Sequence, residues 1–290
     1  MESIDEMKQP TISIVTAVKN GAPYIRTLVE SVLSQDYAAF EHIIVDDGSN
    51  DDGETVRILR EYRHLRWWSR PNKGQYASQN EALSVAIGDI VCVISADDVM
   101  VTPRTLSIVA AAWERNPTLD VLYGKALHMN SKGMILPYQL ELNGPFASRI
   151  HHHHLFIQHC SLFASRETII RGGIWFDPAF KYAGDWDWII RLLDASRSVE
   201  YVPKALSIIR KHEQQTSRLS SAPRILAEHR EVLRRHGGSN SIHMAIKKVH
   251  QYWALLRIGS YLLTNERPEV FMSTLVDWWH RRSSRIENVK

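Results

Sequence analysis

Two adjacent carboxylates, Asp97 and Asp98, end the stretch at residues 91–98, which begins with an apolar run rich in β-branched side chains. Such a run predicts a buried parallel strand, and open α/β sheets bind ligands just beyond the carboxyl ends of their strands. Two acids at that point suit a hard divalent cation such as Mg²⁺ or Mn²⁺, which takes carboxylate oxygens and commonly holds phosphate oxygens as well. The alternative is a solvated turn, because Asp is common wherever a strand ends.

A second pair of acids, Asp185 and Asp187, lies where a loop containing Pro178 and Gly184 runs into a helical pattern. The apolar residues of that pattern include Trp186, Ile189, Ile190 and Leu193. Asp185 falls at the N-terminus of the expected helix, where it is a helix cap, a general base that takes a proton from a reacting hydroxyl, or both. Residues two apart on a helix do not share a face, so at most one of these acids faces a crevice, and Asp187 is the alternative base.

The stretch before residue 98 contains the elements that must position the first pair of acids. Strands are expected at residues 11–18, 42–45, 65–68 and 91–96, and helices at residues 25–33, 56–62 and 76–87, the last closed by Gly88. This alternation predicts a doubly wound, mostly parallel sheet with helices on both faces. Right-handed crossovers put all four strand ends on one edge, so Thr16, Asp47, the loop at residues 72–75 and Asp98 should face one crevice.

Missing motifs exclude some classes of ligand, and the composition indicates the cellular compartment. Neither G-x-G-x-x-G nor G-x-x-x-x-G-K-[ST] follows the first strand, which argues against a dinucleotide site or a P-loop. The two cysteines, Cys92 and Cys160, form neither a disulfide framework nor a metal-binding spacing, so a reducing compartment is expected. We find no signal-peptide pattern and no apolar run long enough to cross a bilayer, and therefore expect a cytoplasmic protein.

Charge is unevenly distributed along the chain. Residues 1–209 carry a net charge of −5 and residues 210–290 a net charge of +8, within a total of +3. The basic part contains two apolar helical stripes, made of Ile242, Ala245, Ile246, Val249, Trp253 and Leu256, and of Phe271, Leu275, Trp278 and Trp279. We favour packing of these stripes on the domain or across a homodimer, and the alternative is contact with an anionic membrane surface.

Five short motifs in a fixed order resemble the nucleotide-binding half of family 2 glycosyltransferases with the GT-A fold. They lie at residues 11–20, 31–35, 43–49, 72–75 (with Asn80 and Gly88-Asp89 after it) and 96–98. The resemblance implies a nucleoside diphosphate sugar as donor, UDP-linked by family preference, and Mn²⁺ or Mg²⁺ as cofactor. One departure is Ser95, where many members carry an acid that touches the ribose.

This resemblance also assigns roles to individual residues. Thr16 and Asp47 would hold the base and the ribose, within a nucleotide-binding set of Thr16, Ala17, Val18, Asn20, Asp47, Lys73, Gly74, Asn80 and Asp97. Asp98 would ligate the metal, His212 would approach the metal and the diphosphate, and Asp185 would be the base. Gly184 stands where many members carry an acid. Taken without the resemblance, His212 is equally well a polar surface or core histidine.

A GT-A domain is expected at residues 1–217, with a nucleotide-binding half at 10–100 and an acceptor-side half at 101–217, followed by a C-terminal helical region at 218–290. In the acceptor-side half, a helix is expected at 104–115, and a strand and a hairpin at 121–123, 126–129 and 134–136. Residues 151–154 are four consecutive histidines. They cannot all point at one ion from a strand or a helix, so we favour a partly exposed acceptor-side loop over a metal site.

These features together predict an inverting, metal-dependent glycosyltransferase. It would move a sugar from a nucleoside diphosphate sugar to a hydroxyl of a glycan, a lipid-linked sugar or another acceptor in cell-surface polysaccharide synthesis, in the cytoplasm or at the inner face of the membrane, with no nucleic-acid partner. A nucleotidyltransferase would show a Gly-rich, Arg-containing loop after the first strand, where residues 17–20 read Ala-Val-Lys-Asn. A non-catalytic sugar-nucleotide-binding subunit of an assembly complex is the other alternative.

Overall fold

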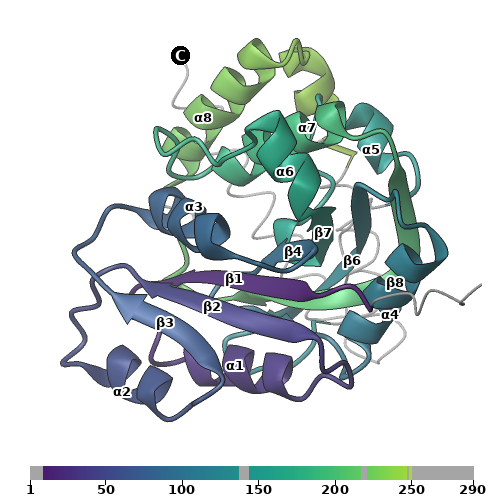
Figure 1. Cartoon of the computed structure of the whole chain (residues 1–290). Coiled ribbons are helices and arrows are strands. Elements are labelled where there is room, and N and C mark those ends of the chain that lie inside the picture. The colour runs from purple at the N-terminus through teal and green to yellow at the C-terminus, as the bar shows by residue number, and fades with distance from the viewer. Residues whose placement is uncertain (1–8, 137–143, 217–220, 247, 250–290) are drawn as a thin grey trace, which may run out of the picture.

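The computed structural model describes residues 9–136, 144–216, 221–246 and 248–249. Within these residues a single mixed sheet runs through the molecule, with its strands in the order β3-β2-β1-β4-β7-β6-β8-β5. Figure 1 shows helices on both sides of this curled sheet. The structure therefore confirms the predicted α/β class.

The N-terminal half has the predicted alternation of strands and helices. Its elements are β1 (Ile12–Val18), α1 (Ile25–Leu33), β2 (Phe40–Asp46), α2 (Glu54–Arg60), β3 (Leu65–Ser69), α3 (Gln75–Val85) and β4 (Ile90–Val93). β1 pairs in parallel with both β2 and β4, and β2 pairs in parallel with β3. The four strands therefore end on one edge of the sheet, as the crossover rule predicts.

The C-terminal half extends the sheet with mixed pairing. Its elements are β5 (Val99–Met100), α4 (Thr105–Arg115), β6 (Val121–Asn130), α5 (Ala147–Ile150), a 3₁₀ turn (His159–Ser161), β7 (Leu162–Ser165), α6 (Arg166–Gly172), α7 (Gly184–Ala195), β8 (Val199–Lys211) and α8 (Ala222–Arg235). β7 runs antiparallel to both β4 and β6, β8 runs parallel to β6, and β5 runs antiparallel to β8. β8 thereby brings its C-terminal end back beside the end of β4.

Several elements of this half differ from the predictions. β6 is one strand of 10 residues where two short strands were expected, and a shift of its register with β8 near Lys125 accounts for the interrupted pattern. β7 and α6 were not predicted, because strands and helices this short show little periodicity. β8 begins at Val199, and its first part, which is exposed or only partly buried and lacks a continuous apolar run, was not predicted as a strand.

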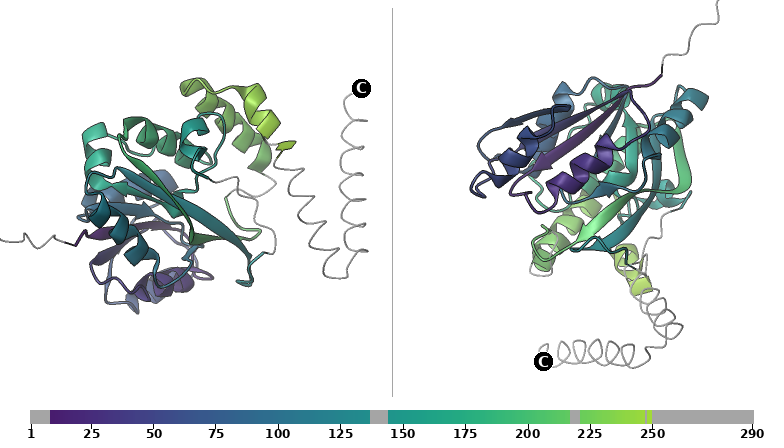
Figure 2. Two further views of the ribbon diagram at one scale, coloured as in Figure 1. Left: turned by 90° about the vertical axis from the view of Figure 1, so that its right-hand side faces the viewer. Right: turned by 90° about the horizontal axis from the view of Figure 1, so that it is seen from below.

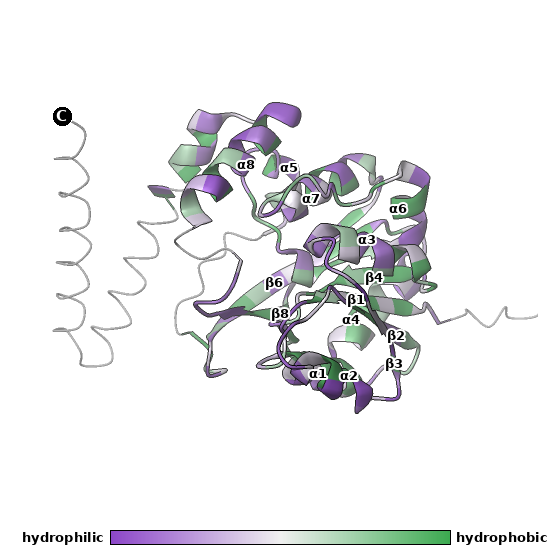
Figure 3. Cartoon of the chain, turned by 90° about the vertical axis from the view of Figure 1, so that its left-hand side faces the viewer, coloured by the Kyte–Doolittle hydropathy of each residue, from purple (hydrophilic) through white to green (hydrophobic). Residues whose placement is uncertain are grey.

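The sheet separates two hydrophobic cores. One core lies on the side of α3, α6 and α7 and includes Leu83 and Ile189, whereas the other lies on the side of α1, α2 and α4 and includes Val29 and Val109. Figure 2 shows the sheet between these helices from two further directions. In Figure 3 the central strands carry hydrophobic colour and most helices show both colours, as expected for elements buried on one side only.

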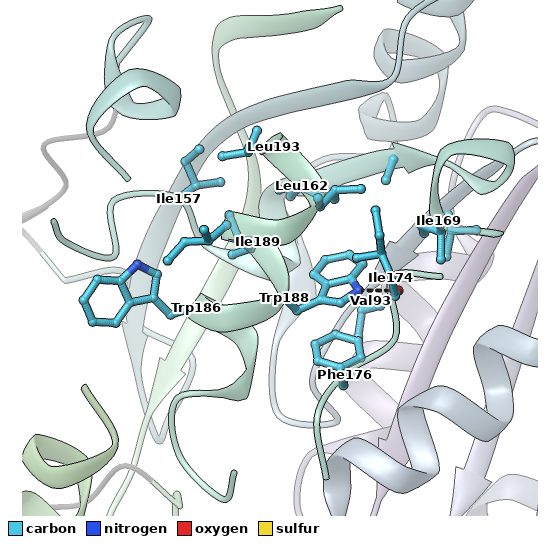
Figure 4. Packing of buried hydrophobic residues seen from close by; sticks show 14 of the residues in the cluster. Val93, Ile157, Leu162, Ile169, Ile174, Phe176, Trp186, Trp188, Ile189 and Leu193 are labelled. Atoms are coloured by element: carbon cyan, nitrogen blue, oxygen red, sulfur yellow. Dashed lines mark hydrogen bonds between the residues drawn. The ribbon is translucent and has the colours of Figure 1, made fainter. Parts of the chain in front are cut away.

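Aromatic side chains connect α7 to α3. Trp186 and Trp188 of α7 are buried, and Trp188 stacks on Phe176 with ring centroids 4.6 Å apart. Phe176 in turn stacks on Tyr76 of α3 at 5.4 Å. The indole Nε1 of Trp188 donates a hydrogen bond of 3.1 Å to the carbonyl oxygen of Ile174, as Figure 4 shows. These contacts fix the start of α7 relative to the parallel half of the sheet.

Helix α8 packs with the rest of the domain, although it lies in the region expected to form a separate appendage. Val232 and Leu233 belong to the same core as α7, and Arg235 forms an ion pair of 2.7 Å with Asp177. The helical stripe expected from residue 242 is described only in part, and the stripe at residues 271–279 lies outside the described residues. Among the described residues no helix is long and apolar enough to span a membrane.

Gly88 has a different role from the one expected. α3 ends at Val85, so Gly88 does not cap it. Instead its N–H donates a hydrogen bond of 2.9 Å to the hydroxyl of Ser13 on β1. A Cβ on Gly88 would lie 2.6 Å from the backbone nitrogen of Ser13, so the chain needs a glycine here for β1 and β4 to begin side by side.

We expect Gly88→Ala to lower the free energy of unfolding by about 1–3 kcal/mol, because the added methyl group must displace backbone in a packed sheet. The matched control is Gly144→Ala, whose Cβ would lie 3.5 Å from the Phe146 ring, an ordinary van der Waals contact, and a change within about 0.5 kcal/mol is expected there. Urea unfolding followed by circular dichroism measures both. Equal stability of the two variants would contradict the close-approach argument.

Candidate active site

Asp47, directly after β2, organises the loop that follows β3. Its carboxylate accepts hydrogen bonds from the N–H groups of Lys73 (2.8 Å) and Gly74 (3.0 Å) and pairs with the guanidinium of Arg70. Asp47 is only 4% exposed. Three of the predicted nucleotide-binding residues therefore lie together at this edge of the sheet, and Asp47 holds the loop that carries the other two.

Asn20 joins the end of β1 to the end of β2. Its N–H donates to the hydroxyl of Ser49 (2.8 Å), and its side chain exchanges two hydrogen bonds of 2.8 Å with Asn50. Asn20 has a φ of +54°, a conformation that Asn adopts more readily than most residues. The predicted residue is therefore at the sheet edge and has its backbone fixed.

The remaining predicted residues of β1 differ in accessibility. Ala17 is partly exposed, whereas Val18 is buried and Thr16 has no exposed surface. The hydroxyl of Thr16 lies 3.4 Å from Nε2 of the buried His42. In this conformation Thr16 contributes to the core, and its contact with a nucleotide base stays a prediction.

Asn80 makes contacts that were not foreseen. Its Nδ2 donates to the carbonyl oxygen of Phe176 and its Oδ1 accepts from the N–H of Phe176, each at 2.8 Å. Both polar groups of the side chain are therefore used within the protein. Asn80 thereby bridges α3 and the segment before α7, and its contact with a nucleotide stays a prediction.

Asp97 and Asp98 lie in the turn after β4, facing the end of β8. The N–H of Arg210 donates to Oδ1 of Asp98, and Nε of Arg210 donates to the carbonyl oxygen of Asp97, both at 3.0 Å. Nε2 of His212 lies 2.8 Å from Oδ2 of Asp97. The structure thus brings His212 to the two acids, but its contact is with Asp97 and not with Asp98.

This donor set fits a hard divalent cation. Asp98 is 4% exposed, and burial together with the charge of Asp97 raises the pKa of its carboxyl. Neighbouring carboxylates that raise each other's pKa are stabilised by a positive ion, and carboxylate oxygens are the ligands that Mg²⁺ and Mn²⁺ prefer. The other ring nitrogen of His212, Nδ1, is buried and has no hydrogen-bond partner among the described residues.

The first turn of α7 presents Asp185, and it is capped by side chains from other elements. Ala183 precedes the helix and provides no side-chain cap, so Asp185 is the second residue of α7 and not its N-cap. Its Oδ1 nevertheless accepts a hydrogen bond of 2.9 Å from the N–H of Trp186 in the same turn. The Tyr76 hydroxyl accepts from the N–H groups of Gly184 (3.0 Å) and Asp185 (3.3 Å), and Glu228 of α8 accepts from the N–H of Ala183 (2.9 Å). Side chains from α3 and α8 thus accept N–H groups at the helix start, and capping engages one carboxylate oxygen of Asp185, Oδ1.

The position of Tyr76 also explains why residue 184 is a glycine. A Cβ on Gly184 would lie 2.6 Å from the Tyr76 ring. Because Tyr76 is buried and stacked on Phe176, its ring has no room to retreat. A larger residue at position 184, such as the acid common in the family this sequence resembles, would require a different arrangement of Tyr76.

Asp187 lies in a structural ion-pair network. It is 2% exposed, with Oδ2 at 2.7 Å from Arg191 and Oδ1 at 2.9 Å from Nε2 of His236. A buried carboxylate with two such partners is not available to take a proton from a substrate. The side chain of Asp185, in contrast, keeps 18% of its surface exposed, which favours Asp185 over Asp187 as the base.

His159 links Asp185 to the turn that carries the acidic pair. Its Nδ1 lies 3.5 Å from Oδ2 of Asp185, and its Nε2 lies 3.1 Å from the hydroxyl of Ser95. Burial lowers the pKa of His159, but the nearby carboxylates of Asp185 and Asp98 outweigh this effect, so the net shift is upward. His159 was not predicted from the sequence, because it lies in a 3₁₀ turn (His159–Ser161) that carries no recognisable motif.

Comparison with known proteins places this site in a family. The model of glycosyl transferase family 2 matches residues 13–170, more than half of the chain. The chain belongs to glycosyltransferase family 2. This family 2 glycosyltransferase is also 29% identical over 211 residues to the O-antigen biosynthesis protein RfbC of Myxococcus xanthus, which covers 69% of this chain and 16% of that protein.

Solved structures show the same fold. Staphylococcus aureus TarS, residues 1–349, in complex with UDP-GlcNAc has a TM-score of 0.59 at 24% identity, covering 71% of this glycosyltransferase and 60% of TarS. The mannosyltransferase PcManGT of Pyrobaculum calidifontis, in complex with GDP-Man and Mn²⁺, has a TM-score of 0.59 at 18% identity, covering 94% and 81%. These similarities confirm the GT-A fold. The chain spans less than half the length of several other curated glycosyltransferases that it matches.

We expect Tyr76→Phe to lower the free energy of unfolding of this glycosyltransferase by about 1–3 kcal/mol, because it leaves the buried N–H groups of Gly184 and Asp185 without an acceptor. The matched control, Tyr62→Phe, removes a hydroxyl that bonds at the surface and should change stability by less than about 0.5 kcal/mol. Thermal or urea unfolding measures both variants. If Tyr76→Phe is no less stable than the control, the capping role is refuted.

Proposed function

We propose that this enzyme is an inverting, metal-dependent glycosyltransferase that moves a sugar from a UDP-sugar to an acceptor hydroxyl in cell-surface polysaccharide synthesis. The observation that carries the proposal is the continuous arrangement of Asp185, His159 and Ser95, which connects a partly exposed carboxylate to the acidic turn of Asp97 and Asp98. A base and an acidic ligand set are thereby held on one connected site.

Asp185 acts as the general base in this proposal. It accepts the proton of the acceptor hydroxyl while the oxygen attacks the anomeric carbon, and the bond from that carbon to the diphosphate oxygen breaks on the opposite face. The configuration at the anomeric carbon is therefore inverted without a covalent intermediate. His159, 3.5 Å away, positions the carboxylate of Asp185.

Asp98 and Asp97 would hold the Mn²⁺ or Mg²⁺ ion, with His212 beside them. When bound, the ion supplies positive charge to the diphosphate that leaves. Arg210 keeps the turn in place through its hydrogen bonds to both acids. The Mn²⁺ present with GDP-Man in PcManGT supports a metal in this class of site.

The nucleotide would lie along the edge formed by the ends of β1 and β2. Asp47 and the loop of Lys73 and Gly74 are preassembled there by hydrogen bonds, and Ala17 and Asn20 border it. The complex of TarS with UDP-GlcNAc supports a UDP-sugar as donor. The similarity to an O-antigen biosynthesis protein supports a glycan or lipid-linked acceptor, which would be met in the cytoplasm at the inner face of the membrane.

Nucleotide binding tests the donor site. We expect UDP or a UDP-sugar with Mn²⁺ or Mg²⁺ to raise the melting temperature, since a ligand at a hundredfold excess over Kd stabilises the folded state by about 2.7 kcal/mol. Chelator should abolish the rise, and Asp98→Asn should remove its metal-dependent part. Asp36→Asn, which alters an exposed acid, is the control. An unchanged metal-dependent rise in Asp98→Asn would exclude Asp98 as a ligand.

Turnover tests the base. In Asp185→Asn we expect the rate of sugar transfer, measured as UDP release in the presence of glycan and lipid-linked acceptors, to fall by about 10²–10⁴-fold. Binding of UDP with Mn²⁺ should be unchanged, because Asn keeps the shape of the side chain. Near-normal turnover in the folded variant would refute the role of Asp185. Nucleotide binding without turnover in the wild-type protein would instead favour a non-catalytic binding subunit.

A further inference from the structure

A second cluster of metal-binding residue types lies outside the active site. His151 and His152 follow α5, and Asp194 lies in the last turn of α7. One ligand atom from each of these three residues lies within 4.8 Å of the other two. Figure 1 shows α5 beside α7, on the side of the molecule that also carries α8.

Distances within this cluster are close to those of a tetrahedral metal site. Nε2 of His152 lies 3.1 Å, and Nε2 of His151 lies 3.6 Å, from Oδ1 of Asp194. In a tetrahedral zinc site with bonds of 2.0–2.1 Å, neighbouring ligand atoms are separated by about 3.3 Å. Side-chain shifts of a few tenths of an ångström would bring these two separations to that value.

His151 already has the hydrogen bonding of a metal ligand. Its Nδ1 donates to the carbonyl oxygen of Ser148, which leaves the lone pair on Nε2. The side chain is 5% exposed, and Nε2 faces Asp194 with no hydrogen-bond partner among the described residues. Metal-binding histidines commonly have their other ring nitrogen held by a backbone carbonyl in this way.

We propose that His151, His152 and Asp194 form a binding site for Zn²⁺, separate from the acidic site of Asp97 and Asp98. Two imidazole nitrogens and one carboxylate oxygen favour a borderline-soft ion such as Zn²⁺ over Mg²⁺ or Mn²⁺. Three protein ligands leave a fourth position for water. The side chains of His152 and Asp194 are 33% and 48% exposed, so the ion can enter from solvent.

The other two histidines of residues 151–154 have different roles. Nδ1 of His153 accepts a hydrogen bond of 3.2 Å from the N–H of Ser239, and the ring of His154 packs 4.9 Å from that of His243. This division agrees with the argument that four consecutive histidines cannot address one ion. From the sequence we favoured a loop over a metal site for residues 151–154. That expectation treated the four histidines as one group and did not include Asp194.

The proposed ion would connect the turn after α5 to the far end of α7. At the near end, Nε1 of Trp186 already donates a hydrogen bond of 2.8 Å to the carbonyl oxygen of His151. Bound Zn²⁺ would therefore fix the turn at both ends of the helix that presents Asp185. The inference does not depend on the proposed reaction, because it concerns binding and stability only.

The test uses the full chain after removal of metals by chelator. Calorimetric titration with Zn²⁺ in the presence of saturating Mg²⁺ should show one ion bound, and His152→Ala and Asp194→Asn should each weaken its binding at least about 100-fold. Asp98→Asn and His64→Ala, a histidine outside the cluster, should bind Zn²⁺ as the wild type does. Zn²⁺ should raise the melting temperature of the wild type but not of the two cluster variants.

Either of two results would overturn the proposal. Equal Zn²⁺ binding by the wild type and both cluster variants would mean that other residues hold the ion. Absence of stoichiometric Zn²⁺ binding in the wild type would reduce the cluster to a surface ion pair between His152 and Asp194. Melting temperatures measured in chelator establish that the variants are folded, and His152→Cys, which supplies another zinc ligand, should recover part of the affinity.

Discussion

Two neighbouring carboxylates at the end of a buried strand place a strong electrostatic constraint on this protein. Asp98 is almost completely buried beside Asp97, and an ionised carboxylate in such surroundings needs compensating charge or hydrogen bonds. The structure supplies part of this compensation from β8, through the N–H and guanidinium of Arg210 and the ring of His212. The return of β8 to the end of β4 is therefore an electrostatic requirement as well as a feature of the sheet.

The second half of the domain packs around α7. The buried N–H groups at the start of that helix need hydrogen-bond acceptors, and this need explains much of how α7 packs. Backbone N–H groups in a first helical turn have no partner within the helix. Here Tyr76 and Glu228 accept them from α3 and α8, so that one helix end joins elements on both sides of it. Asp185 therefore has a fixed backbone, and its carboxylate uses one oxygen, Oδ1, within the first turn while the other, Oδ2, lies 3.5 Å from His159.

Two sets of candidate metal ligands lie at separate places in the fold. The acidic turn offers oxygen ligands, which suit a hard cation and a diphosphate, whereas the cluster at the C-terminal end of α7 offers imidazole nitrogens. Both sets are connected to α7, the first through His159 and Asp185 and the second through Asp194. Both sets of residues therefore include a side chain of α7.

The sequence by itself determined the parallel half of the sheet and the convergence of Asp47, Lys73, Gly74 and Asp98, because alternating strand and helix patterns are local and crossover handedness is general. It also singled out Asp185, through its position at a helix start. Only the tertiary structure could show that Asp187 forms ion pairs with Arg191 and His236, and that Asn80 bonds the backbone of Phe176. It also shows that His159 and Asp194 contact residues distant in the sequence. Such contacts depend on how irregular segments fold against each other, and local periodicity contains no information about them.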